Sequence, residues 1–175
     1  IDCAGIRLQE ATDALNAFGQ IYLNQTMASG VIPQITGIFG TCGGGLAMIP
    51  ALTDFTFMEG KKAKLFVNSP NAIAGNQIAK CDTSAADFQA EGGLVDFVGT
   101  EDEIFAQMRA LISMLPANNE DDASYEECTD DLNRACDGLA ESVAEPAYIL
   151  SNISDNSLFI ETKKNYATDM VTGFI

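Results

Sequence analysis

The sequence predicts an α/β fold in which parallel strands alternate with helices. A near-continuous apolar run at Val31–Phe39 is typical of a strand buried on both faces. A glycine-rich turn at Gly40–Gly45 leads directly into a short apolar helix through Leu52, and two further apolar runs follow at Phe55–Met58 and Ala63–Val67. A chain of 175 residues, 47% of them hydrophobic, is long enough to bury one sizeable core.

The first helix is predicted from apolar residues at helical spacing, and Gly30 ends it. Its apolar face carries Leu8, Ala11, Leu15, Phe18 and Tyr22. We expect further short helices over residues 72–78 and 84–91, followed by a strand at Leu94–Val98.

A longer helix is predicted from its first turn. Thr100 and Glu103 have the spacing of a capping box, in which each side chain bonds the other residue's backbone amide. The helix is expected to run to Leu115, where Pro116 stops it.

Composition divides the chain into three expected parts. Residues 1–116 carry the alternating strands and helices, and residues 117–129 are polar, acidic and without periodicity, as expected of a linker. Residues 130–175 contain a predicted helix at Ala147–Ile153 and two short strands, too little to bury a core of their own. Because both ends of the chain resemble interrupted strands, we expect a piece from the middle of a longer subunit.

Charge and composition exclude several functions. The net charge of −16 argues against a nucleic-acid or anionic-membrane partner, and the apolar runs are too short to span a bilayer. The five scattered cysteines fit a reducing cytoplasm. Because the chain has no histidine, Ser-His-Asp and Cys-His catalysis are excluded within it and no metal site is expected.

Two glycine-containing turns remain as candidates for chemistry. Cys3–Arg7 leaves a strand end and enters the first helix, and Cys42–Gly45 leaves the buried strand and enters the next helix. Glycine lets the backbone approach a ligand closely, and a helix N-terminus presents free N–H groups. Two such amides aimed at one oxygen would form an oxyanion hole for a thioester enolate. The alternative is that the glycines only allow close packing of helix on strand.

Four segments resemble one family, the carboxyltransferase subunits of biotin-dependent acyl-CoA carboxylases and decarboxylases. Asp2–Glu10 resembles the family's D-S-G-G-A-R-[IL]-Q-E motif, and Ala28–Ile35 resembles S-G-V-I-P-Q-I. Gly40–Gly45 followed by Pro50–Met58 is similar to G-P-C-[AG]-G-G and P-A-L-T-D-F-x-F-M, and Val171–Phe174 is similar to V-T-G-F. Residues 80–93 depart from the family by lacking its histidine.

The resemblance implies a crotonase-like (ClpP/crotonase) fold of repeated β-β-α units. The chain would hold the second half of the N-terminal domain, residues 1–116, and the start of the C-terminal domain, residues 130–175. It also implies carboxyl transfer between biotin and an acyl-CoA, with biotin carried on a partner protein or domain, the biotin carboxyl carrier protein. The subunits of the family form homo-oligomers, and a cytoplasmic location is expected.

The resemblance further implies which residues act. The backbone amides of Ala4, Gly5 and Gly44 are expected to stabilise the enolate, while the substrate is expected to contact Cys42, Gly43, Gly45 and Arg7.

Other interpretations stay open at this point. A sodium-pump decarboxylase subunit, or an incomplete chain acting only in subunit assembly, fits the same motifs. A crotonase hydratase is disfavoured because Ala47 and Asn71 stand where those enzymes carry glutamates. Lys61, Lys62 and Lys64 are possible contacts for coenzyme A phosphates, and Asp54 is expected to bond backbone rather than ligand.

Overall fold

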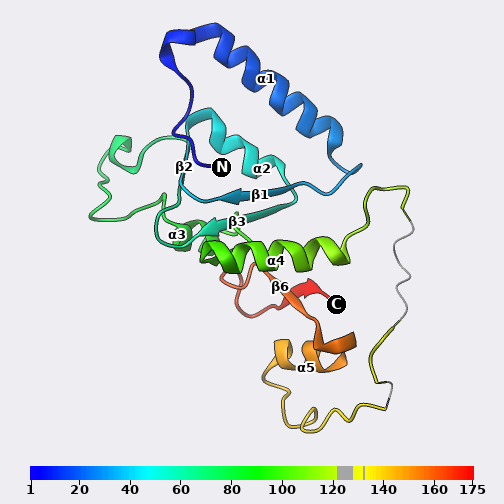
Figure 1. Ribbon diagram of the computed structural model, residues 1–175. Coiled ribbons are helices and arrows are strands. Elements are labelled where there is room, and N and C mark those ends of the chain that lie inside the picture. The colour runs from blue at the N-terminus through cyan, green and yellow to red at the C-terminus, as the bar shows by residue number, and fades with distance from the viewer. Residues whose placement is uncertain (122–127, 132) are drawn as a thin grey trace.

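Three parallel strands form the centre of the fold (Figure 1). The computed structural model describes residues 1–121, 128–131 and 133–175. The strands are β1 (Ile35–Ile38), β3 (Phe55–Glu59) and β5 (Phe97–Gly99), in the order β1-β3-β5. Phe57 of β3 lies opposite both Gly37 and Phe97 in register. The predicted parallel α/β arrangement is therefore confirmed.

A second pair of parallel strands lies beside this sheet. It joins β2 (Thr41–Gly43) to β4 (Lys64–Phe66), with Cys42 opposite Leu65. The chain passes from β3 to β4 through a tight turn in which the Glu59 carboxylate accepts hydrogen bonds from the amides of Lys61 and Lys62, at 3.0 and 2.5 Å. Thus the two runs predicted around this turn belong to different sheets.

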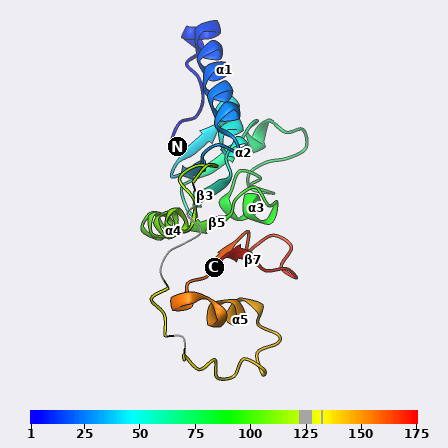
Figure 2. The same ribbon diagram turned by 90° about the vertical axis from the view of Figure 1, so that its right-hand side faces the viewer.

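Helices cover this framework and extend it at both ends. Figures 1 and 2 show α1 at one end of the molecule and α5 at the other, with α4 alongside the central sheet. The helical elements are η1 (Leu8–Glu10), α1 (Ala11–Ala28), η2 (Gly44–Ala47), α2 (Met48–Leu52), η3 (Pro70–Ala72), α3 (Ala86–Glu91), α4 (Glu101–Met114), α5 (Pro146–Ile153) and η4 (Asp155–Ser157). The predicted capping box of α4 is present, with Thr100 and Glu103 bonded reciprocally.

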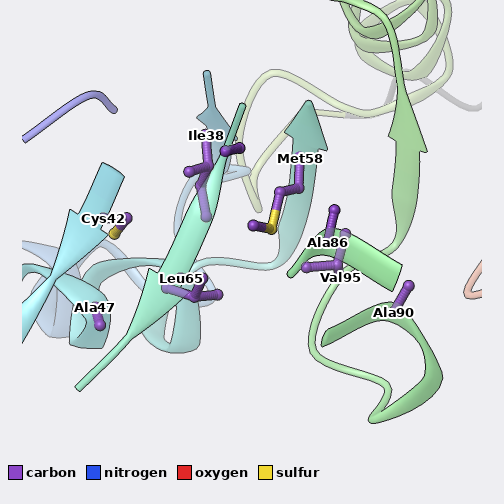
Figure 3. Packing of buried hydrophobic residues seen from close by; sticks show 9 residues of the cluster. Ile38, Cys42, Ala47, Met58, Leu65, Ala86, Ala90 and Val95 are labelled. Atoms are coloured by element: carbon purple, nitrogen blue, oxygen red, sulfur yellow. The ribbon is translucent and has the colours of Figure 1, made fainter. Parts of the chain in front are cut away.

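The main core lies between the two sheets and α3. Figure 3 shows Ile38, Leu65 and Met58 in the middle of this cluster, between Cys42 at one side and Val95 at the other. All five residues are at most 2% exposed. The core therefore begins directly behind the glycine turn of β2, so the position of that turn is determined by close packing.

A second core joins the last part of the chain to the central sheet. β6 (Ile160–Thr162) and β7 (Thr172–Phe174) form an antiparallel hairpin. Ile160 packs with Phe57, Ile104 and Leu111 in one buried cluster, and Figures 1 and 2 show the hairpin beside α4. The hairpin thus buries its apolar face against residues of the first 116, as expected of a segment without its own core.

A lysine also holds the hairpin in place. The Lys163 ammonium donates to the Gly93 carbonyl at 2.6 Å and lies 3.3 Å from the Asp96 carboxylate. Asp96 is only 7% exposed and accepts a second bond from the Thr56 amide. Because a buried carboxylate needs such partners, this contact links β3, β5 and the hairpin loop.

The strand predicted at residues 31–39 is shorter in the structure. β1 begins only at Ile35, because the amides of Val31 and Ile32 bond back to the Ala28 carbonyl at the end of α1. Both side chains are almost half exposed. Residues that complete a helix C-terminus in this way are not available to a strand.

Two other predicted elements differ. The expected helix at 72–78 is only the 3-10 turn η3, since Gly75 has a positive φ of 76° and the Asn71 side chain accepts the Ile78 amide. The expected strand at 94–98 is shifted to β5, because the Leu94 amide bonds to Gln89 at the end of α3.

Part of the expected acidic linker, residues 117–129, lies outside the described residues, since 122–127 are not described. At its start, the Asn119 amide donates to the Val31 carbonyl at 2.9 Å. The division into residues 1–116, 117–129 and 130–175 stays a prediction.

Stability is expected to depend on the second core. Ile104→Ala should lower the free energy of unfolding by about 2–4 kcal/mol, because Ile104 is fully buried and its removal leaves a cavity. Ile112→Ala, on the same helix but 58% exposed, should cost less than about 1 kcal/mol. Urea denaturation followed by circular dichroism gives both values. Equal losses for the two variants would contradict the packing described for α4.

Candidate functional site

The two glycine turns predicted from the sequence lie side by side. Cys3 forms a parallel bridge with Cys42, and the Gly43 amide donates to the Cys3 carbonyl at 3.3 Å. The Asp2 carboxylate accepts the Thr41 amide at 3.0 Å. The first residues of the chain therefore pair with β2 as a short additional strand. Both turns follow this pairing and lead into their helices from the same end of the small sheet.

Close approach of these turns requires glycine at one position above all. A Cβ on Gly43 would lie 2.8 Å from the Ala4 carbonyl oxygen, closer than real side-chain carbons come. Gly5 has φ 132° and Gly44 has φ 63°, conformations that side chains disfavour. Around Gly44 nothing lies within 4 Å of a built Cβ, so the turn opens onto free space.

Two of the amides expected to act have no protein acceptor. No described residue accepts a hydrogen bond from the amides of Ala4 or Gly5. Gly44 directly follows the Gly43–Phe66 pair, the last pair of the β2–β4 ladder. Gly44 begins η2, where the first amides of a helical turn have no partner inside it. The structure thus brings together the three predicted catalytic positions, beside Gly43 and the buried Cys42. Whether their amides converge on one oxygen stays a prediction.

Helix α1 covers one side of the site, which the sequence did not predict. The Tyr22 hydroxyl donates to the Gly45 carbonyl, and Phe18 stacks on Tyr22 with ring centroids 5.9 Å apart. A groove of about 320 Å³ lies between α1 and the first turn, lined by Gly5, Ile6, Arg7, Glu10, Ala14, Ala17, Phe18 and Ile21. Four of these residues recur at helical spacing, 14, 17, 18 and 21, and that spacing is the signal that could have indicated the groove.

Two of the charged candidates, Arg7 and Asp54, are bonded to other residues of the chain. Arg7 forms an ion pair with Glu10 at 3.5 Å, with both side chains largely exposed. Asp54 accepts the Gln34 amide at 2.8 Å, which confirms its expected backbone role. Lys61 and Lys62 differ from these two, since both are exposed and form no ion pair among the described residues.

Lys64 is held by the segment that departs from the family motif. Its ammonium bonds the Asp82 carboxylate at 2.6 Å, and the Ser84 amide and hydroxyl donate to the same carboxylate. The hydrogen bond from Lys64, with those from Ser84, lowers the pKa of Asp82. Residues 80–93 thus fasten β4 to α3.

The cysteine behind the second turn is a packed thiol. Cys42 is fully buried, and burial raises its pKa to about 11. Such a thiol is almost wholly protonated at neutral pH and shielded from solvent, so it does not act as a nucleophile toward dissolved reagents or substrate. If Cys42 contacts the substrate as predicted, it does so through its backbone and not through its thiol.

A larger groove lies elsewhere in the described structure. It has a volume of about 710 Å³ and runs between Ile32–Ile35 and the end of α4, bounded by residues 112–117 and 121. No residue of either glycine turn lines it, so we do not assign the candidate chemistry to it.

Comparison with known proteins identifies the family. The carboxyl transferase domain family matches the chain over residues 1–175. The transcarboxylase 12S structure with methylmalonyl-coenzyme A and methylmalonic acid bound matches with a TM-score of 0.88 and 30% identity, over 99% of this chain and 36% of that one. The chain therefore belongs to the carboxyl transferase domain family and has its crotonase-like fold.

Two curated relatives also match nearly the whole chain but only part of their own length. The methylmalonyl-CoA decarboxylase subunit alpha of Veillonella parvula is 34% identical, over 99% of this chain and 36% of that protein. The propionyl-CoA carboxylase carboxyltransferase subunit of Haloferax mediterranei is 35% identical over the same shares. The chain thus spans about a third of the length of these relatives. None of the helices in the described residues is long and apolar enough to cross a membrane.

Burial should protect Cys42 from alkylation. At pH 8 iodoacetamide is expected to modify the exposed Cys3 and Cys81 rapidly, but Cys42 at least 100-fold more slowly, because its thiol is buried and protonated. Mass spectrometry of digested samples over time gives the rates. The difference should disappear in 6 M guanidinium, and a rapid reaction of Cys42 in the folded chain would show that β2 opens.

Acid should weaken the contact at Asp82. Its lowered pKa means that the charged form stabilises the fold above the unfolded value near 3.9 and that this stability is lost as pH falls through the folded pKa. Asp82→Asn should cost about 1 kcal/mol at pH 7. It should also flatten the fall in unfolding free energy below pH 4, measured by urea titration. Asp169→Asn, at an exposed loop position, is the control that keeps the parent slope.

Proposed function

We propose that this chain forms the acyl-CoA side of a biotin-dependent carboxyltransferase, which moves a carboxyl group between biotin and the α-carbon of an acyl-CoA. The observation that carries the proposal is the pair of adjoining turns, in which the Ala4 and Gly5 amides have no acceptor among the described residues and Gly44 lies at the start of the second turn. In addition, the family match extends through both turns. Acyl-CoA carboxyl transfer needs an enolate, and backbone amides are suitable groups for stabilising one.

These amides would act by binding charge. As the α-proton leaves or the carboxyl group departs, negative charge collects on the thioester oxygen. Amide donors that are already oriented stabilise that charge without reorganising, and removal of one such donor costs about 100- to 1,000-fold in rate. Since the Gly44 position faces free space, a thioester oxygen has room to approach.

Biotin would be supplied by a carrier protein or domain and would donate or accept the carboxyl group. The residues of this chain fit that role because they provide amides and an apolar groove but no histidine base. An acyl-CoA bound in the groove under α1, beside its small residues Ala14 and Ala17, would displace water from the neighbouring turn. Arg7, Gly43 and Gly45 border the same region and remain the proposed substrate contacts.

The acyl group proposed is propionyl, with methylmalonyl as its carboxylated form. The relatives described above are named for these two thioesters, which are the two ends of one carboxylation. A decarboxylase and a carboxylase match with nearly equal identity, so the proposal covers the shared transfer step and not its direction. The net charge of −16 means that the CoA phosphates need local donors, for which the exposed Lys61 and Lys62 are candidates.

The proposal includes an oligomer of carboxyltransferase subunits in the cytoplasm. The related transcarboxylase 12S forms a hexamer assembly in its crystal structure, and its subunit is about three times as long as this chain. All five cysteines of this chain are free thiols, which supports a reducing compartment.

Hydration by crotonase chemistry is the weaker alternative. It requires a carboxylate beside the acyl group, at the positions of Ala47 and Asn71. Ala47 is 6% exposed and packs in the main core, and the Asn71 side chain bonds the Ile78 amide. Neither position supplies an acid or base.

The transfer assay uses the whole protein with [¹⁴C-carboxyl]methylmalonyl-CoA and the biotinylated carrier. Gly43→Ala should lower kcat/KM by at least 100-fold, since its methyl group would push against the Ala4 carbonyl and separate the two turns. Gly19→Ala adds the same methyl group in α1, where nothing lies within 4 Å, and should keep parental activity.

Calorimetric titration with propionyl-CoA separates the remaining interpretations. Saturable binding together with label transfer supports the proposal. Neither binding nor transfer would favour a chain that acts only in subunit assembly, and equal activity of the two glycine variants would contradict the proposed role of the turns.

A further inference from the structure

We infer that Cys3 and Cys42 form a modification site, a pair of thiols that a peroxide converts reversibly into a cross-strand disulfide next to the proposed oxyanion hole. Formation of the bond is independent of the proposed function, but its effect on carboxyl transfer rests on that function.

The first argument is the position of the two residues. They face each other in a parallel bridge, flanked by the Gly43 amide bonded to the Cys3 carbonyl at 3.3 Å. Opposed residues on neighbouring strands are about 4.7–4.9 Å apart and point to the same face of the sheet. Disulfides join cysteines whose Cα atoms are about 4.4–6.8 Å apart, so this spacing is within their range.

The second argument is the direction of the thiols. Cys3 Sγ donates to the Gly5 carbonyl at 3.3 Å, and Cys42 Sγ donates to the Leu46 carbonyl at 3.5 Å. Both sulfur atoms therefore bond carbonyls further along their own segments, and Cys3 is close enough to Cys42 to contribute, after burial, to the raised pKa of the Cys42 thiol. On the Cys3 strand, Ile1 packs against the core that contains Cys42, which places Cys3, two residues later, on that same face.

The third argument is the contrast in exposure. Cys3 is exposed and open to a small oxidant, while Cys42 is fully buried and shielded from it. This is the arrangement of an attacked thiol and a resolving thiol. Among the described cysteines, only Cys3 and Cys42 are bridge partners.

The chemistry balances with hydrogen peroxide as the oxidant. The Cys3 thiolate attacks one peroxide oxygen, the O–O bond breaks, and the product is a sulfenic acid with hydroxide leaving. The Cys42 sulfur then attacks the Cys3 sulfur, the S–O bond breaks, and water leaves. Two thiols lose two electrons in total, and one peroxide becomes two waters.

A Cys3–Cys42 disulfide would disturb the site because the two glycine turns follow directly after these cysteines. A disulfide holds its Cβ atoms about 3.8 Å apart, roughly 1 Å closer than unlinked neighbours on two strands. The Ala4 carbonyl already approaches Gly43 too closely for any Cβ there, so the turns have little room to absorb the change. A displacement of about 1 Å in positioning groups can cost about 100-fold in rate.

The test treats the reduced whole protein with a small excess of hydrogen peroxide. After blocking and digestion, mass spectrometry should show the Cys3 and Cys42 peptides joined with the loss of two hydrogens. Carboxyl transfer should fall between tenfold and 100-fold and recover with dithiothreitol. Cys3→Ser should show no linked peptide and keep its activity in peroxide. Cys81→Ser, which removes another exposed thiol, should respond like the parent.

The outcomes separate the two proposals. An active protein in which peroxide takes Cys3 to sulfinic acid, without the linked peptide, overturns the disulfide. A linked protein with unchanged activity overturns its effect on the site. A linked peptide in a protein that transfers no carboxyl group even when reduced supports the thiol pair and removes the proposed function alone.

Discussion

The parallel contact between Cys3 and Cys42 is the constraint on which the candidate site depends. It is a single bridge, yet it places two turns distant in sequence against each other. Its closeness leaves no room for a Cβ on Gly43, and that requirement explains a glycine there more directly than helix packing does. Because the donors are backbone amides, their positions follow from strand pairing and not from side-chain rotamers.

Packing behind the turns stabilises that contact. Cys42 and Leu65 are paired in the small sheet and buried in the main core, so β2 has little freedom to move. On the opposite side, Tyr22 of α1 bonds the Gly45 carbonyl. The second turn is thus held between a core and a helix, while the first turn depends on a short strand end. We expect the first turn to be the more easily displaced of the two.

The last part of the chain illustrates how a small segment is stabilised by a neighbour. The β6–β7 hairpin contributes Ile160 and Phe174 to a core made mainly by β3 and α4. Lys163 adds polar bonds to Gly93 and the buried Asp96. The Lys163 contacts thus connect the hairpin to the segment between α3 and β5. This connection joins the last part of the chain to the first part, wherever a domain boundary lies between them.

The sequence alone determined the alternation of parallel strands and helices, the capping box at Thr100 and the family motifs at both glycine turns, because these are local patterns. It did not determine that Val31 and Ile32 finish α1 instead of starting β1. It also did not show the groove beneath α1 or the pairing of Cys3 with Cys42. Those features depend on which distant segments meet, and contacts between residues 39 positions apart leave no periodic signal in the chain.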